Sequence, residues 1–80
     1  MDRINFELSN IGDLIAIAEH VIGCRMALRS SGKLLEDNSF DSISLYQDIY
    51  QLDTREKLID FIKFHSKKYR DERLIASRNL

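Results

Sequence analysis

The sequence contains little of what usually stabilises or identifies a small protein. Cys24 is its only cysteine, so no internal disulfide can form, and a lone thiol is typical of a reducing, intracellular setting. The chain has no proline and only three glycines, which removes the residues that interrupt helices most strongly. No apolar run approaches the roughly 20 residues of a membrane-spanning helix. These absences favour a helical protein with no membrane partner, and they predict a cytoplasmic location, in its own cell or in a host cell.

Metal and catalytic motifs are also missing. His20 and His65 lie far apart in the sequence, and no CxxC or HxxxH spacing is present, so no metal site is predicted. Neither paired carboxylates nor a nucleophile with an adjacent base can be placed in a pocket from the sequence. We therefore expect a protein that is not an enzyme and that needs no cofactor.

The chain of 80 residues has the length of one domain, with a core only just large enough to offset chain entropy. Apolar residues at helical spacing predict helices over about 10–29, 40–52 and 54–77. The expected fold is a single all-α domain covering residues 1–80, a small three-helix bundle with a four-helix bundle as the alternative. The first helix is apolar on two sides, which predicts that it lies between neighbours on both.

Local signals mark the ends of these helices. Side chains that can accept a hydrogen bond from a helix N-terminus precede each one: Ser9 or Asn10, Ser39 or Asp41, and Asp53. Asp53 and Glu56 have the spacing of a capping box. Gly32 follows the first helix, where a glycine in the left-handed conformation commonly ends a helix.

The segment 3–8 alternates polar and apolar residues. Ile4, Phe6 and Leu8 would share one face of a strand, whereas Ile4 and Leu8 also fit a helical turn, though poorly. The alternation favours a short extended N-terminal arm.

Charge is distributed unevenly along the chain. Residues 1–60 contain six Lys and Arg against eleven Asp and Glu, a balance of −5, whereas residues 61–80 contain six against two, a balance of +4. At about 100° per residue, Lys63, Lys67 and Arg70 point away from the apolar face of the third helix. This basic ridge is the surface that we single out first.

The basic ridge has two functional interpretations, besides that of a solvated helix face. It could bind a phosphate backbone through counterion release, but the isoelectric point of about 6.1 is low for a nucleic-acid-binding protein. Aromatic residues near charge favour a protein partner instead, because they are common interface anchors. The candidate partner-binding residues are Tyr46, Tyr50, Lys63, Phe64, Lys67, Arg70 and Arg73.

Four further expectations concern the first and third helices. His65 lies on the apolar face of the third helix and is expected in the core or at an interface. Cys24 lies in an apolar seam and is expected to be a buried, inert thiol. Lys68 and Glu72 have the spacing of an exposed ion pair, and the last dozen residues are expected to project beyond the core or to fray.

The sequence as a whole predicts a non-enzymatic regulatory or inhibitory protein that acts by binding another protein. The alternative is a nucleic-acid-binding regulator that uses the basic face of the third helix. Because the first helix is apolar on two sides, we also expect a homodimer. In size, lack of motifs and charge segregation, the chain is similar to the small regulators, toxin-immunity proteins and anti-defence inhibitors of bacteria and phages.

Overall fold

The computed structural model describes residues 10–32 and 40–78. These residues form three helices and no strand, namely α1 (Ile11–Ser30), α2 (Ser42–Ile49) and α3 (Arg55–Arg78). The prediction of a small all-α bundle is therefore confirmed for the described residues. The arm expected at residues 3–8 lies outside them.

The starts of α1 and α2 follow the predicted capping signals. Asn10 Oδ1 accepts a hydrogen bond of 2.8 Å from the backbone N–H of Asp13, and Asp41 Oδ1 accepts one of 3.1 Å from that of Ser44. Gly32 follows α1 with a φ of 77°, the left-handed conformation that glycine adopts without strain. The cap positions on α1 and α2 were thus readable from the sequence.

The start of α3 corrects the sequence-based expectation. Thr54, and not Asp53, caps the helix: Thr54 Oγ1 accepts a hydrogen bond of 3.2 Å from the N–H of Lys57. The carbonyl of Thr54 also accepts the 3.2 Å bond from the N–H of Leu58 that opens the helix. Asp53 lies one residue too early and pairs instead with Lys57 Nζ at 2.9 Å.

α2 is shorter than the predicted helix over 40–52. It begins at Ser42 and ends at Ile49, because the next three N–H groups bond to carbonyls only three residues back. These bonds run from Tyr50 to Gln47, from Gln51 to Asp48 and from Leu52 to Ile49. This tighter hydrogen bonding is common at helix ends.

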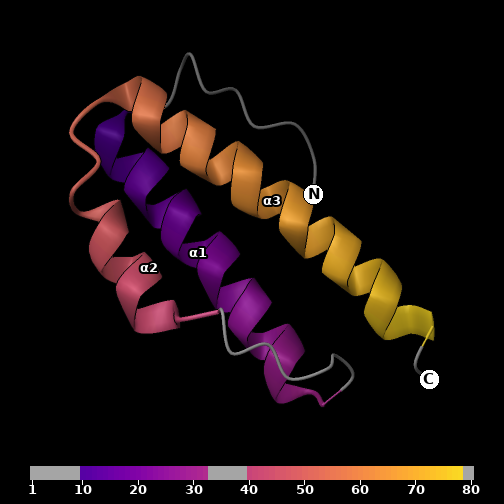
Figure 1. Cartoon of the computed structure of the whole chain (residues 1–80). Coiled ribbons are helices and arrows are strands. Elements are labelled where there is room, and N and C mark those ends of the chain that lie inside the picture. The colour runs from indigo at the N-terminus through magenta and orange to yellow at the C-terminus, as the bar shows by residue number, and fades with distance from the viewer. Residues whose placement is uncertain (1–9, 33–39, 79–80) are drawn as a thin grey trace.

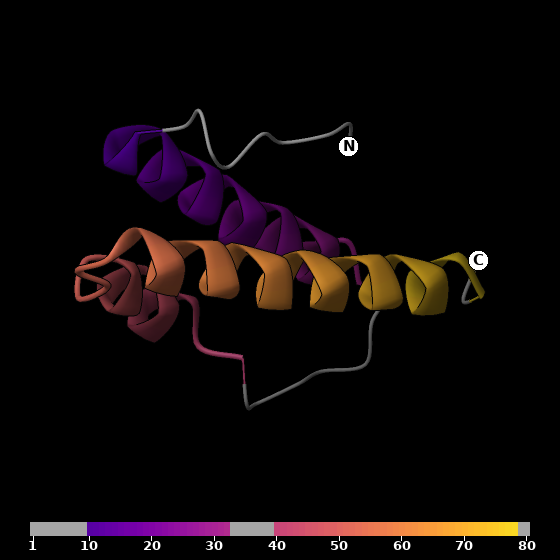
Figure 2. The same ribbon diagram turned by 90° about the horizontal axis from the view of Figure 1, so that it is seen from above.

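The helices are arranged around α1, which packs against both α2 and α3 (Figure 1). α1 and α3 run side by side in the same general direction, and seen from above, α2 lies close to the start of α3 (Figure 2). The expectation of a central first helix is confirmed.

The apolar core lies where α2 meets the first halves of α1 and α3. Its side chains are at most 1% exposed: Leu14, Ala18, Ile22, Ile49, Leu58 and Ile62. The core is small, so it leaves large apolar side chains on the surface, and Phe64 and Leu74 of α3 are 58% and 60% exposed.

Candidate functional site

The second half of the interface between α1 and α3 contains charged side chains. Arg25 and Arg29, one turn apart on α1, both reach Glu72 of α3. Arg25 donates to the two carboxylate oxygens at 2.9 and 2.7 Å, and Arg29 donates to them at 3.0 and 2.6 Å. The three side chains are only 9%, 18% and 13% exposed. One carboxylate therefore pairs with two guanidinium groups in an interface that is largely buried from solvent.

His65 and Phe40 complete this buried charged cluster. Arg25 Nη1 donates to His65 Nδ1 at 2.6 Å, so the imidazole is neutral and its proton is assigned to Nε2. The Phe40 ring centroid lies 4.8 Å from Cζ of Arg25 and 4.0 Å from that of Arg29, within cation–π distance. The cluster of Arg25, Arg29, Phe40, His65 and Glu72 thus joins α1 to α3 and to the segment that precedes α2.

The buried charged cluster shifts two pKa values. Burial lowers the pKa of His65, and the Arg25 charge lowers it further, to about 4. Burial alone would raise the pKa of Glu72, but the hydrogen bonds and charges of Arg25 and Arg29 outweigh it and hold this pKa at about 2. Neutral His65 and ionised Glu72 are the forms that the folded protein favours.

The buried charged cluster corrects two sequence-based predictions. Glu72 does not form the expected exposed pair with Lys68, because it turns inward to the arginines of α1. Of the last dozen residues, the described ones, 69–78, do not simply project or fray, since α3 continues to Arg78 and Ala76 is only 4% exposed. The available signal was that Glu72 lies on the apolar face of its helix, where a carboxylate needs a buried partner.

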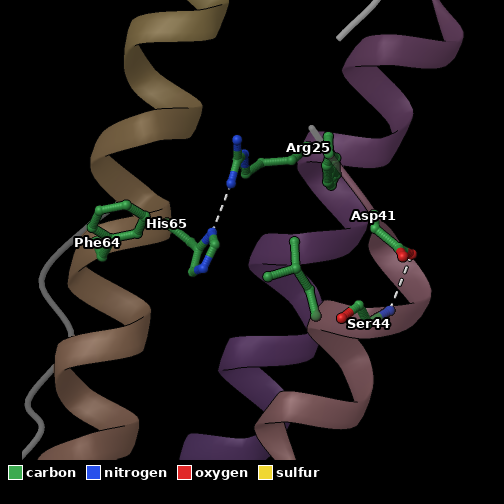
Figure 3. Close-up of a pocket in the computed structure, with 7 residues that line it drawn as sticks. Arg25, Asp41, Ser44, Phe64 and His65 are labelled. Atoms are coloured by element: carbon green, nitrogen blue, oxygen red, sulfur yellow. Dashed lines mark hydrogen bonds between the residues drawn. The ribbon is translucent and has the colours of Figure 1, made fainter. Parts of the chain in front are cut away.

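A pocket of about 250 Å³ lies beside this cluster (Figure 3). Its lining residues come from α1, α3 and the segment at the start of α2: Arg25, Phe40, Asp41, Ser44, Leu45, Phe64 and His65. Phe64 meets His65 edge-on, with ring centroids 5.0 Å apart, and Lys68 Nζ lies 5.6 Å from the Phe64 centroid. Phe64 is therefore both a pocket residue and an exposed aromatic at the edge of α3.

Lys63 and Lys67 of the predicted basic ridge lie on the side of α3 that faces away from α1, and Arg70 lies at the border of that side, where it also lines a cavity with residues of α1. Lys63, Phe64, Lys67, Arg70 and Leu74 are all exposed, and their spacing places them together, opposite the buried Leu58 and Ile62. We call these five residues the α3 outer face. It combines three cations with two apolar side chains, and the helical spacing places the exposed Asp60 and Asp71 within it, between Phe64 and Lys67.

Arg73 lies away from the α3 outer face, on the edge of α3 that approaches α1. Together with Arg70 it lines a second, smaller cavity of about 90 Å³, whose other lining residues are His20, Val21, Cys24, Ser66 and Tyr69. The guanidinium of Arg73 lies 5.7 Å from the centroid of the Tyr69 ring. Cys24 is only half-buried there, so the expectation of a buried thiol is wrong.

Tyr46 of α2 and Tyr50, the residue that follows α2, do not join the α3 outer face, because Tyr46 packs on the core and Tyr50 bonds to Glu19 of α1. Tyr46 is half-buried and packs on the apolar core, and a Cβ added to Gly23 would lie 3.6 Å from its hydroxyl. Tyr50 is 65% exposed and donates a 2.7 Å hydrogen bond to Glu19 Oε2, which raises the pKa of Tyr50. The predicted partner-binding residues therefore fall in three places: on the α3 outer face, at the edge of α3 that carries Arg73, and around α2.

The described residues carry no group of three or more His, Cys, Asp or Glu side chains placed to hold a metal ion. Over the same ranges, no helix is both long enough and apolar enough to cross a membrane. No protein-family model, curated protein or solved structure matches the chain.

Proposed function

We propose that the protein is a non-enzymatic regulator or inhibitor that docks the α3 outer face on an acidic surface of another protein. The observation that carries the proposal is the composition of this face. Lys63, Lys67 and Arg70 lie exposed beside Phe64 and Leu74, on a side of the helix that the other described residues, 10–32 and 40–78, leave largely uncovered. Complementary charge speeds the encounter and sets the orientation of docking.

The apolar side chains of the α3 outer face favour a protein partner over a nucleic acid. Phe64 and Leu74 are more than half exposed, and the neighbouring Ile75 is 47% exposed. A phosphate backbone gains nothing from a leucine or an isoleucine, whereas a protein pocket buries them at a gain of roughly 25 cal/mol per Å². The expected partner surface is therefore acidic and contains an apolar depression that accepts Phe64.

The α3 outer face is held in place before binding. Glu72 ties the second half of α3 to Arg25 and Arg29, and Leu58 and Ile62 bury the first half in the core. A preformed helix loses little conformational entropy on docking. The protein would thus bind as a rigid body.

The proposal is tested by capture from extracts of the native or host cell, with mass spectrometry and then a measured affinity for each captured protein. A true partner loses at least tenfold in affinity with both Lys67→Glu and Phe64→Ala, the scale of an interface anchor. Two matched controls, Lys57→Glu and Ile43→Ala, remove an exposed cation and an exposed apolar side chain elsewhere and should leave the affinity unchanged.

Two outcomes would contradict this proposal. Captured proteins that bind all four variants equally would show that the α3 outer face is only solvated. Retention on duplex DNA or RNA that Lys67→Glu abolishes, that Phe64→Ala leaves intact and that weakens steeply with salt would favour the nucleic-acid-binding alternative. The predicted homodimer is checked separately by light scattering, as a mass of twice the 9.4 kDa of one chain.

A further inference from the structure

The smaller cavity between α1 and α3 brings the only thiol of the chain together with an imidazole and two guanidinium groups. Cys24 Sγ lies 3.6 Å from Nε2 of His20, one turn earlier on α1. Arg70 and Arg73 reach the same cavity of about 90 Å³ from α3. The thiol is half-buried and His20 is exposed, so a small reagent can approach from the solvent.

The two guanidinium groups that line this cavity indicate that it attracts an anionic ligand. Among residues 10–32 and 40–78, no ion pair joins Arg70 or Arg73 to a carboxylate, in contrast to Arg25 and Arg29, which share the carboxylate of Glu72. Arg73 lies over Tyr69, which holds its charge at the cavity wall. A concave site lined by one sign of charge concentrates ions of the other sign, and a guanidinium pairs readily with a carboxylate.

The contact between Cys24 and His20 places an imidazole where it can deprotonate the thiol. A thiol reacts as its thiolate, and nearby positive charge stabilises that form. His20 Nε2 lies in contact with the sulfur and can accept its proton, as a base does beside a nucleophilic cysteine. A nucleophile, a base and anion-attracting side chains therefore share one small cavity.

We propose that Cys24 is a modification site for small anionic disulfides, which carry carboxylates that Arg70 and Arg73 attract. The Cys24 proton passes to His20 Nε2, and the thiolate attacks one sulfur of the disulfide. A new bond forms between Cys24 Sγ and that sulfur while the original S–S bond breaks. The other half leaves as a thiolate and takes the proton from His20. The incoming disulfide is the oxidant, so no further reagent is needed.

The test compares three disulfide probes on the reduced full-length chain, with the adduct followed by mass spectrometry. The probes are 5,5′-dithiobis(2-nitrobenzoate), which is anionic, 4,4′-dithiodipyridine, which is neutral, and cystamine, which is cationic. Each rate is divided by the rate of the same probe with N-acetylcysteine amide. We expect the normalised rate of the anionic probe to exceed that of the cationic one by about tenfold or more, and the excess to shrink in high salt.

Three variants separate the roles of the residues. Arg73→Gln should lower the normalised rate of the anionic probe several-fold and leave the neutral probe nearly unchanged. His20→Asn should slow all three probes. Lys67→Gln removes an equal charge from the same helix but outside the cavity, and it should leave the preference for the anionic probe intact.

Any of three results would overturn the inference. Equal normalised rates for the three probes, or a preference that Arg73→Gln and Lys67→Gln reduce equally, would show that the cavity does not select anions. A thiol that reacts a hundredfold more slowly than the free reference with every probe would show that Cys24 is inert. The cavity residues that the test changes, His20 and Arg73, lie outside the α3 outer face, so its outcome is distinguishable from that of the proposed function even though Arg70 belongs to both surfaces.

Discussion

The interface between α1 and α3 is held together differently at its two ends. In its first half, Leu58 and Ile62 pack into the apolar core at no more than 1% exposure, next to α2. In its second half, Arg25 and Arg29 both form ion pairs with the carboxylate of Glu72. Apolar contacts are non-directional and insensitive to pH, whereas a buried charge needs each of its partners. The charged half of the interface is therefore predicted to tolerate substitutions less well than the apolar half.

The largest effect is expected for Glu72→Gln. The substitution keeps the shape of the side chain but leaves two buried guanidinium groups facing each other without a carboxylate. Breaking a buried ion pair in this way costs about 3–5 kcal/mol, to be measured as the loss in free energy of unfolding in urea by circular dichroism. Asp60→Asn, an exposed change on the same helix, is the control and should stay within about 0.5 kcal/mol. Equal losses for the two variants would contradict the special role of the charged half.

Leu58→Ala probes the apolar half and should cost about 2–5 kcal/mol, because it leaves a cavity that the small core fills only in part. The loss relative to wild type should be the same at pH 7 and at pH 5, since no charge is involved. A loss that changes steeply with pH would show that the apolar half is not independent of the charged one.

Acidification should lower the free energy of unfolding in two steps, both of which arise in the charged half of the interface. His65 has its pKa lowered from 6.5 to about 4 in the folded protein, so the unfolded chain takes up that proton first and stability falls between pH 6.5 and pH 4. Glu72 has its pKa lowered from 4.5 to about 2, so a further loss follows between pH 4.5 and pH 2. Each step is worth at most about 3 kcal/mol.

His65→Asn separates the first of these steps from the second. It offers an amide oxygen to Arg25 Nη1 in place of the ring nitrogen, but it cannot be protonated. The free energy of unfolding of this variant should fall less than that of the wild type between pH 6.5 and pH 4, measured by urea titration at several pH values. Parallel losses in the two proteins would mean that His65 does not cause the decline.

The parts of the fold that could be predicted are those that depend on near neighbours in the chain. The helical spacing of Leu58 and Ile62 identifies the inner face of α3, and it therefore also placed Lys63, Lys67 and Arg70 on the outer one. Pairings between distant residues could not be predicted. Arg25 and Glu72 are 47 residues apart, and nothing local states which residue of α1 faces which residue of α3.

The candidate site shows the same limit. The exposure of the α3 outer face follows from the repeat of about 3.6 residues per turn within a single helix. The cavity that joins Cys24 to Arg73 depends on how two helices cross, and so does the separation of Tyr50 from α3. The sequence could place each of these residues on a helix face, but not the faces relative to one another.

The smallest effect is expected at the start of α3, at the apolar end of the interface, where the sequence favoured the wrong cap. Thr54→Ala should cost about 1 kcal/mol, because the N–H of Lys57 loses its acceptor. Asp53→Ala should cost less, since its pair with Lys57 is exposed to solvent, where ion pairs contribute little. Urea denaturation of both variants decides between the two caps. A greater loss from Asp53→Ala would restore the capping box of Asp53 and Glu56 and move the start of α3 by one residue.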